Sequence, residues 1–284
     1  MVGELYVVAT PIGNLQDMTP RAIDVLRRVS LIAAEDTRHS QRLLRAFDIE
    51  TPLISYHQHN EQARVERLLT ALESGDVALI SDAGTPAISD PGAVLVCAVR
   101  EAGYVVTPIP GVSAVIAAAS ASGLIEGPYL FQGFLPRSGE DRRAAMGRML
   151  QANVPVVLFE SPNRLGATLT HLADFFGDRQ AVVARELTKL HEEIVGGTLG
   201  ELAAIFSDRD VKGEVVIVVA EAASESETPT EQSDARQLAA RLVADGLKPS
   251  RAARELAKIT GLSGSEAYDL VRSVSASGAP GTSA

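Results

Sequence analysis

Three apolar runs near the N-terminus each end in a loop that is rich in proline and glycine. The runs cover residues 5–9, 77–80 and 104–109, and a helical pattern follows each loop. Short apolar runs bounded by turn residues are typical of buried strands. Strands and helices that alternate in this way form a parallel sheet, and the loops at the carboxyl ends of its strands bind ligands. We therefore expect an α/β domain with a binding site at one edge of its sheet.

The first loop contains Pro11 and Gly13, and the helix after it is expected to have Thr19 as its N-cap and Pro20 as its first residue. This loop lacks G-x-G-x-x-G, and no G-x-x-x-x-G-K-[ST] occurs in the chain. The two commonest classes of nucleotide-binding protein are therefore not indicated.

The loop after residues 77–80 has the richest chemistry of the chain. It supplies Asp82, Gly84, Thr85, Pro86, Asp90, Pro91 and Gly92. Small residues let a backbone approach a ligand closely, and prolines stiffen the loop. An unusually long turn would explain the glycines and prolines but not the flanking serines and aspartates, so the pattern favours a binding loop.

Two acids, Glu35 and Asp36, directly follow a short apolar run at residues 31–34. Acids at a strand end in a parallel sheet face the ligand crevice. The alternative is a solvated loop with a helix N-cap at Thr37 or Ser40. His57 and His59 form an H-x-H pair, but further metal ligands are lacking in the sequence, so we expect no metal and interpret this stretch as a polar surface or substrate loop.

The pattern changes at Gly127 and predicts a second α/β domain with a mixed sheet. Its strands are expected at residues 128–136, 154–159, 180–187, 192–198 and 213–220, and its helices at 144–151, 165–176 and 199–207. Residues 137–143 are interpreted as a charged loop. The domains are accordingly placed at residues 1–114 and 115–222.

The last part of the chain is a distinct electrostatic unit. The net charge is −10 overall, −9 for residues 1–224 and +3 for residues 235–274. Residues 223–234 are interpreted as an acidic linker, 235–274 as a small helical module and 275–284 as a disordered tail. The last two of its three helices look like a helix-turn-helix, for which RNA contact and a packing or dimerisation role both stay open.

The bulk composition indicates a cytoplasmic protein. A single cysteine, Cys97, excludes an intrachain disulfide, and no secretory signal is recognisable. The longest small-apolar stretch, residues 112–124, is too short to span a bilayer, so no membrane contact is expected. The negative charge argues against broad, non-specific binding of nucleic acids.

Six motifs in order make the chain resemble the ribosomal RNA small-subunit methyltransferase I family of the tetrapyrrole-methylase superfamily. They are ATPIGNL at residues 9–15, AEDTR at 34–38, SDAGTP at 81–86, PGVSA at 110–114, FESP at 159–162 and RELTK at 185–189. The resemblance implies 2′-O-methylation of a cytidine ribose in the decoding region of 16S rRNA, with S-adenosylmethionine as the cofactor. It also implies a homodimer of two-domain subunits, with the cofactor in the cleft between the domains.

The resemblance also implies a set of cofactor contacts. They fall on Ile12, Gly13, Asp82, Ala83, Gly84, Thr85, Ile88, Ser113, Ala114, Glu160 and Leu187. Ile12 replaces a proline of the superfamily, and Gly-Gly-Asp becomes residues 83–85, where Asp82 is a candidate substitute for the lost acid. Backbone groups of Glu160 and Leu187 are expected to hold the adenosine end.

A ribose hydroxyl is barely acidic, so a base should assist the reaction. The candidates are Glu35, Asp36 and Lys189. Lys189 qualifies only if burial lowers its pKa; otherwise it would anchor a phosphate or pair with Glu192 or Glu193 on the surface. The cations expected to grip the RNA backbone are Arg38, Arg137, Arg142, Arg143 and Arg164, with a solvated face as the alternative for each.

Two other functions stay open. One is methylation of a small molecule such as a tetrapyrrole with the same cofactor, which would not need the C-terminal module. The other is a non-enzymatic regulator that senses a ligand through its α/β part and binds nucleic acid through its helical tail.

Overall fold

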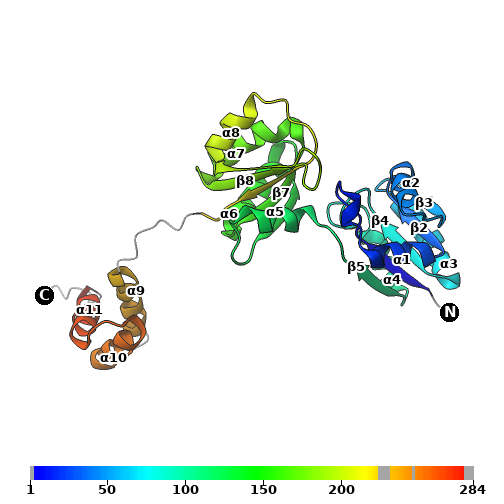
Figure 1. The fold of residues 1–284 in the computed structure, drawn as a ribbon. Helices are drawn as coiled ribbons and strands as arrows, with labels where there is room; N and C mark the ends of the chain where they lie inside the picture. The colour runs from blue at the N-terminus through cyan, green and yellow to red at the C-terminus, as the bar shows by residue number, and fades with distance from the viewer. Residues whose placement is uncertain (1–2, 223–230, 245–246, 278–284) are drawn as a thin grey trace. The chain divides into compact units, whose positions relative to one another are not determined.

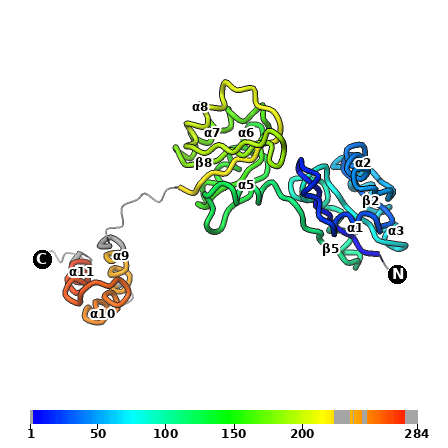
Figure 2. The backbone as a smooth tube through the Cα atoms, in the orientation of Figure 1, coloured from blue at the N-terminus to red at the C-terminus, as the bar shows by residue number. Residues whose placement is uncertain are grey.

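The computed structural model describes residues 3–222, 231–244 and 247–277 (Figure 1). The chain forms two compact units, Met1–Ala222 and Ala223–Ala284. The first contains two α/β halves, each built on its own five-stranded sheet, and the described residues of the second form three helices (Figures 1 and 2).

All strands of the first sheet are parallel, as the sequence predicted. The strand order is β3-β2-β4-β1-β5. The strands are β1 (Glu4–Val8), β2 (Leu31–Ala34), β3 (Leu53–Ser55), β4 (Val77–Ile80) and β5 (Val105–Ile109). Because every strand runs in the same direction, the loops after β1, β2, β4 and β5 all lie at one edge of the sheet.

Helices cover both faces of this sheet because alternate strand residues point to opposite sides. The helices are α1 (Pro20–Arg28), α2 (Thr37–Ala46), α3 (Glu61–Ser74) and α4 (Ala93–Glu101). Ala78 and Ile80 of β4 pack in one cluster with α1 and α2, whereas Val77 and Leu79 pack in the other with α3 and α4. The predicted start of α1 is confirmed, since the Thr19 side chain accepts a hydrogen bond from the backbone N–H of Ala22 at 3.2 Å.

The second sheet is mixed, with the order β6-β7-β10-β8-β9. The strands are β6 (Leu130–Phe134), β7 (Val156–Glu160), β8 (Gln180–Arg185), β9 (Glu193–Thr198) and β10 (Val215–Val219). Only β6 and β7 pair in parallel, and the other pairs are antiparallel. The antiparallel β10 therefore begins beside the carboxyl ends of β7 and β8, because Val215 pairs with both Glu160 and Arg185.

One face of the second sheet packs against three helices and the other against α5 (Ala114–Ser122). The three helices are α6 (Gly139–Ala152), α7 (Leu165–Phe176) and α8 (Leu199–Ser207). The predicted charged loop at residues 137–143 is wrong for its larger part, because α6 already begins at Gly139. Glu140 and Asp141 lie in its first turn, where negative charge complements the helix dipole.

The C-terminal unit consists of α9 (Glu231–Ala244), α10 (Pro249–Thr260) and α11 (Gly264–Ser277). Its core is small and contains Ala239, Ala252, Leu256 and Val271. Helix α9 begins inside the segment interpreted as a linker, and α11 continues to Ser277, past the expected start of the tail; residues 278–284 lie outside the described residues. No helix in the described part of the chain has both the length and the hydrophobicity to cross a membrane.

Candidate functional site

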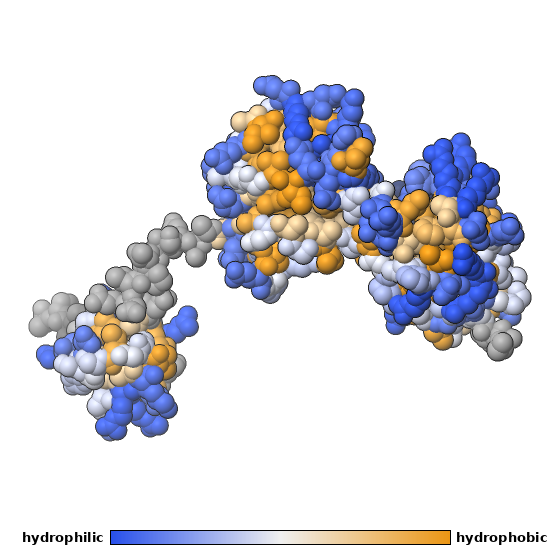
Figure 3. All heavy atoms as spheres, viewed as in Figure 1, coloured by the Kyte–Doolittle hydropathy of each residue, from blue (hydrophilic) through white to orange (hydrophobic). Residues whose placement is uncertain are grey.

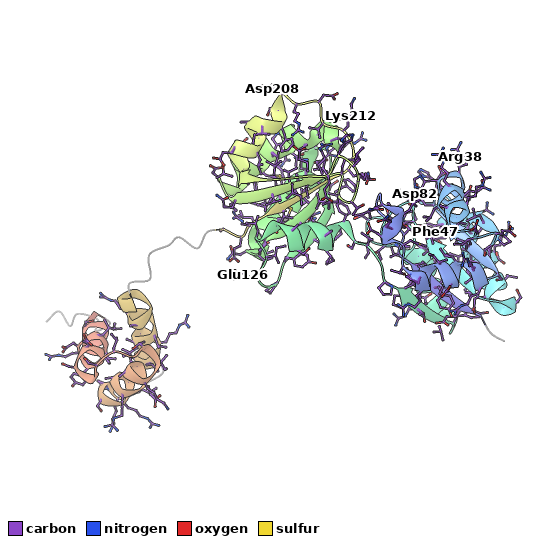
Figure 4. The ribbon with its side chains drawn as sticks, viewed as in Figure 1. Arg38, Phe47, Asp82, Glu126, Asp208 and Lys212 are labelled. Carbon is purple, nitrogen blue, oxygen red and sulfur yellow. The ribbon has the colours of Figure 1, made fainter. Side chains whose placement is uncertain are left out.

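A cavity of about 410 Å³ lies at the carboxyl edge of the first sheet, and residues of the second sheet form its other wall. Glu35 lines it together with most of the residues that the resemblance connects with the cofactor. The predicted cofactor residues that line the cavity are Ile12, Asp82, Ala83, Gly84, Thr85, Ile88, Ser113, Ala114, Glu160 and Leu187. Gly13, Asp36 and Lys189 do not line it. Figure 4 labels Asp82 at this edge of the first sheet.

Two backbone hydrogen bonds join the loops after β1 and β4 beside the cavity. Thr10 N–H donates to the Gly84 carbonyl at 2.9 Å, and Gly84 N–H donates to the Thr10 carbonyl at 3.0 Å. Both backbone groups of Gly84 are thus already occupied. Gly84 adopts φ 74°, a left-handed conformation that favours glycine, so its contribution is the shape of the loop rather than a hydrogen bond to a ligand.

Glu35 and Asp82 join the loops after β2 and β4. Asp36 N–H donates to Asp82 Oδ1 at 3.0 Å, and Asp82 N–H approaches Glu35 Oε2 at 3.4 Å. Burial raises the pKa of Glu35, and although the hydrogen bond from Asp82 and the nearby His57 oppose this, the negative charges of Asp82 and Asp36 add to it. Glu35 is therefore a stronger base than an exposed glutamate.

Asp90 is a third carboxylate at the cavity; our sequence analysis placed it in the predicted binding loop but gave it no catalytic or cofactor-binding role. Burial raises its pKa to about 6, the negative charge of Glu35 adds to the effect, and a hydrogen bond with Ser81 opposes it. A carboxyl group in a cavity whose pKa is raised toward neutral pH is a typical feature of functional sites. The signal was its place in the 81–92 loop, but the family motifs carried our assignment only as far as Ile88.

Asp36 has a structural role. Its side chain caps α2 by accepting hydrogen bonds from Arg38 N–H at 2.8 Å and His39 N–H at 3.4 Å. The bond from Arg38 is the main reason why the pKa of Asp36 is lowered. The N-cap is thus Asp36 and not Thr37 or Ser40, which the alternative interpretation named, and a partly exposed carboxylate with a lowered pKa is a poor candidate for the base.

The loop between β4 and α4 holds two residues in a strained backbone conformation. Ala87 and Ser89 adopt φ 67° and 65°, which non-glycine residues rarely do. Each such residue costs of order 1–3 kcal/mol, and such strain is typical of ligand-binding segments. The two residues flank Ile88, which lines the cavity and is 48% exposed.

The N-terminus of α5 contributes backbone donors. Ser113 is the N-cap and its hydroxyl accepts from Ile116 N–H at 3.5 Å. The N–H groups of Ala114 and Val115, both at the cavity, have no partner among the described residues. Free N–H groups in the first turn of a helix attract anionic groups.

Glu160, at the end of β7, is held by its side chain inside the second half. The carboxylate is fully buried and accepts hydrogen bonds from Ser161 N–H at 2.7 Å, Thr168 Oγ1 at 2.6 Å and Arg164 Nη2 at 3.1 Å. Arg142 joins this network by donating to Thr168 Oγ1 at 3.4 Å. The side chain of Glu160 thus positions the loop after β7, whose residues Ser161 and Pro162 line the cavity.

The peptide groups of Leu187 lie in a segment whose backbone conformation is rare for residues other than glycine. Its neighbours Glu186 and Thr188 adopt φ 51° and 68°. In the described part of the chain, neither the N–H nor the carbonyl of Leu187 has a hydrogen-bond partner. Buried backbone groups are almost always paired, so these two are available to a ligand in the cavity.

Lys189 is an ion-paired residue. Its Nζ donates to Glu186 Oε1 at 2.7 Å and to Glu214 Oε2 at 3.0 Å, and its stem lies against Gly13, where a Cβ would collide with it. Burial alone would lower the pKa of Lys189, but the hydrogen bonds and charges of the two glutamates outweigh it and raise the pKa. The condition for a lysine base is therefore not met, and the ion pair that was considered as the alternative forms with Glu186 and Glu214 rather than with Glu192 or Glu193.

The five candidate arginines fall into two groups. Arg142 is buried and bonded to the Pro136 carbonyl, Thr168 and His171, so its assignment to RNA is wrong. Arg164 is mostly buried and serves Glu160. The exposed arginines are Arg38, Arg137 and Arg143. Arg38 extends from the outer surface of α2, with its side chain 91% exposed (Figure 4).

Glu214 is a further residue at the cavity that sequence reasoning missed. It precedes β10, and no local motif marks it. Only the antiparallel pairing of β10 with β8 brings it to this edge. His57 and His59 have ring centroids 6.0 Å apart, and no group of three or more potential metal ligands occurs within the described residues.

Comparison with known proteins shows that the chain belongs to the tetrapyrrole (corrin/porphyrin) methylases. Residues 4–203 match the tetrapyrrole (corrin/porphyrin) methylase family. A solved cobalt precorrin-4 methyltransferase of cobalamin biosynthesis has the same fold, with a TM-score of 0.58 and 19% identity over 76% of this chain and 94% of that one.

Sequence relatives narrow the class. A protein of Synechocystis named ribosomal RNA small subunit methyltransferase I is 47% identical over 98% of this chain and 100% of its own length. A protein of the same name from Xylella fastidiosa is 48% identical over 91% of this chain and 95% of its own. The chain belongs to the ribosomal RNA small subunit methyltransferase I family, a branch of the tetrapyrrole methylases.

Proposed function

We propose that this protein transfers a methyl group from S-adenosylmethionine to the 2′-oxygen of a cytidine ribose in the decoding region of 16S rRNA. Family membership supports ribosomal RNA as the substrate. The observation that carries the proposal is the cavity itself, which combines apolar walls, unpartnered peptide groups and a carboxylate of raised pKa. The 2′-oxygen, the cytidine and the decoding region come from the family resemblance.

The residues present fit the cofactor. Among the described residues that line the cavity none is cationic, whereas five are acidic. They are Glu35, Asp82, Asp90, Glu160 and Glu214, of which Glu160 is paired with Arg164 and Glu214 with Lys189, so that Glu35, Asp82 and Asp90 remain without a cationic partner within the described ranges. Such an environment favours a ligand with sulfonium and ammonium groups. The free N–H groups of Ala114 and Val115 suit its carboxylate, and the peptide groups of Leu187 suit the edge of its adenine.

S-adenosylmethionine supplies an electrophilic methyl group on a positively charged sulfur. The protein has to align the acceptor oxygen with that group and remove the proton from the hydroxyl. We assign proton removal to Glu35. Asp82 N–H holds its Oε2, and its Oε1 has no hydrogen-bond partner in the described part of the chain, so one oxygen is free to accept the proton. Arg38, Arg137 and Arg143 are proposed to contact phosphates, because all three are exposed cations.

Four further proposals follow from the sequence: the homodimer and the small ribosomal subunit from the resemblance, the cytoplasm from the composition, and a domain boundary from the pattern of elements. The protein is proposed to act as a homodimer, in the cytoplasm, on the small ribosomal subunit. The boundary between its two α/β domains is proposed between residues 114 and 115, directly after the first residue of α5, whose N-cap is Ser113.

The test is methyl transfer from labelled S-adenosylmethionine to undermethylated small ribosomal subunits, with free ribosomal RNA and a tetrapyrrole in parallel. Nuclease mapping should find the label on one cytidine ribose of 16S rRNA. Label on the tetrapyrrole alone would replace the proposal with a small-molecule methyltransferase. Cofactor binding without transfer to any acceptor would indicate a non-enzymatic regulator.

Lys189→Arg is expected to retain most of the methyl-transfer rate. The guanidinium can keep both ion pairs, and a lysine whose pKa is raised is protonated at neutral pH and cannot accept a proton. Single-turnover transfer at pH 7.5 measures the rate. A loss of about 10²-fold or more, of the size expected for a removed base, would return Lys189 to the catalytic role.

The affinity for S-adenosylmethionine is expected to fall as the pH drops through about 6, the pKa of Asp90 in the free protein. Ionised Asp90 attracts a cationic ligand and protonated Asp90 does not, so each pH unit below this value costs up to about tenfold in Kd. Calorimetry between pH 5 and 8 measures the dependence. Asp90→Asn should bind more weakly and with a flatter pH profile, and an unchanged profile would contradict the assignment.

A further inference from the structure

The C-terminal unit carries a groove that the proposed reaction does not use. It lies between α10 and α11 and has a volume of about 410 Å³. Its floor consists of small residues, Ala253, Ala257 and Gly264 among them. Tyr268 forms one side with its side chain 45% exposed, and Arg254 lines the groove from α10. Small residues beside an exposed aromatic ring leave room for a flat group to stack on the ring.

A row of cations lies beside the groove. Arg251, Arg254 and Lys258 are exposed on α10 at spacings of three and four residues, which places them on one face of the helix. Within the described part of the unit no ion pair or side-chain hydrogen bond occupies any of them. The hydrophilic side chains at the lower end of this unit in Figure 3 lie over α10 as Figure 1 labels it. Glu255 is exposed among them on α10, but three cations against one acid leave this helix face positive, and surface cations without an ion-pair partner favour a polyanionic ligand.

The N-terminus of α11 is not available to bind an anion. Glu266 Oε2 accepts from Ser263 N–H at 3.0 Å, and Ser263 Oγ accepts from Glu266 N–H at 3.3 Å. This reciprocal cap already serves the helix N-terminus and adds a negative charge there. Asp269, on the same helix, is the acidic residue among those that line the groove. The side chains of α10 are therefore the elements that can hold an anion.

We propose that the groove between α10 and α11 binds a single-stranded segment of the RNA substrate, with a base stacked on Tyr268 and phosphates held by Arg251, Arg254 and Lys258. The inference rests on the proposed function and adds a second RNA-binding surface to it. Aromatic stacking beside a cationic track is how proteins bind single strands without reading a sequence. A duplex does not offer the face of a base, so it fits this groove less well.

The charge distribution along the chain favours binding of RNA by the C-terminal unit that contains the groove. Residues 1–224 carry a net charge of −9, which repels RNA at a distance, whereas residues 235–274 carry +3. A cationic unit on the same chain captures the RNA and raises its effective concentration near the acidic catalytic unit. The tail thereby compensates for the acidic cavity that suits the cofactor.

The experiment compares full-length variants in their binding of a fluorescent single-stranded RNA of ribosomal sequence at several salt concentrations. The triple variant Arg251→Gln, Arg254→Gln, Lys258→Gln should reduce the slope of log Kd against log salt by about 2, since each phosphate contact on a single strand contributes about 0.7. Tyr268→Ala should weaken binding by about tenfold and leave the slope unchanged. Tyr268→Phe, which keeps the ring, should bind as the wild type does.

The matched control removes exposed charges from another helix of the same unit. Arg236→Gln, Arg241→Gln lies on α9, away from the groove residues in sequence, and should leave the slope unchanged. Circular dichroism of every variant verifies that the helices are folded. A control that flattens the slope as much as the α10 variant does would show diffuse attraction and overturn the groove as the site.

Methyl transfer to small ribosomal subunits separates this inference from the proposed function. If the wild type methylates the RNA and the α10 and Tyr268 variants bind free RNA as the wild type does, the groove assignment is wrong and the proposed function stands. If the variants bind free RNA normally but lose the assembled subunit, the partner is a ribosomal protein and the RNA assignment is overturned. If the wild type transfers no label to RNA, the proposed function itself fails.

Discussion

Glu35→Gln is expected to lower the rate of methyl transfer by about 10²–10⁴-fold, the usual contribution of a general base. The amide has nearly the same shape and can still accept the hydrogen bond from Asp82 N–H, so the loops after β2 and β4 should keep their positions. It cannot accept a proton from the hydroxyl. Single-turnover transfer measures the rate, and calorimetry should find little change in the affinity for S-adenosylmethionine.

The control for this variant is a substitution of the adjacent residue, Asp36. Asp36→Asn keeps an oxygen that caps α2, and asparagine is as good an N-cap as aspartate, so both stability and rate should stay near those of the wild type. The pH profile adds a second readout. Because the pKa of Glu35 is raised, the rate of the wild type should decline on the acid side at a pH above the ordinary glutamate value, and this limb should vanish in Glu35→Gln. A rate lost in Asp36→Asn but kept in Glu35→Gln would reverse the assignment.

Glu160→Ala is expected to lower the free energy of unfolding by about 3 kcal/mol, the lower end of the range for breaking a buried ion pair. The lower end applies because Arg164 keeps 28% of its side chain exposed. The substitution leaves Arg142 and Arg164 near each other without the carboxylate between them, and burial and the charge of Arg164 already lower the pKa of Arg142. For a domain of this size the loss corresponds to a decrease in Tm of about 6–12 °C.

Two variants make this result specific. Glu160→Gln keeps acceptors for Ser161 and Thr168 and should lose less stability than Glu160→Ala. Thr168→Val removes one hydroxyl from the network and should cost about 1 kcal/mol. Calorimetric unfolding measures all three. Below its Tm, Glu160→Gln should still bind S-adenosylmethionine, because the side chain points into the second half; a folded Glu160→Gln that binds no cofactor would show that the side chain contacts the ligand.

Local patterns predicted most of the elements. The bounds of β2, β4, α7 and α8 agree with the sequence to the residue, because each is a periodic apolar run with turn or capping residues at its ends. Helix α6 was expected to start too late. Its first turn consists of charged residues, which resemble a loop in sequence but also suit an exposed helix start.

The candidate site could be predicted only in part. Residues in contiguous loop motifs, such as those at 82–85 and 113–114, were found because the loops after parallel strands meet at one edge. Glu214 was not found, because an antiparallel strand brings it there from a distant part of the chain. The roles of Arg142 and Lys189 were also misjudged, since burial and ion pairing depend on the side chains that surround a residue and not on its own motif.

The sequence by itself determined the class of fold, the position of the binding edge and the family, because strand periodicity, turn residues and loop motifs are all local properties. Only the tertiary structure decided which charged side chains are free to act. Asp36 caps a helix, Arg142 is buried and Lys189 is paired with two glutamates, whereas Glu35 and Asp90 face the cavity with raised pKa values. The physical reason is that the proton affinity and the availability of a side chain are set by burial and by neighbouring charges, and these arise only when distant segments pack together.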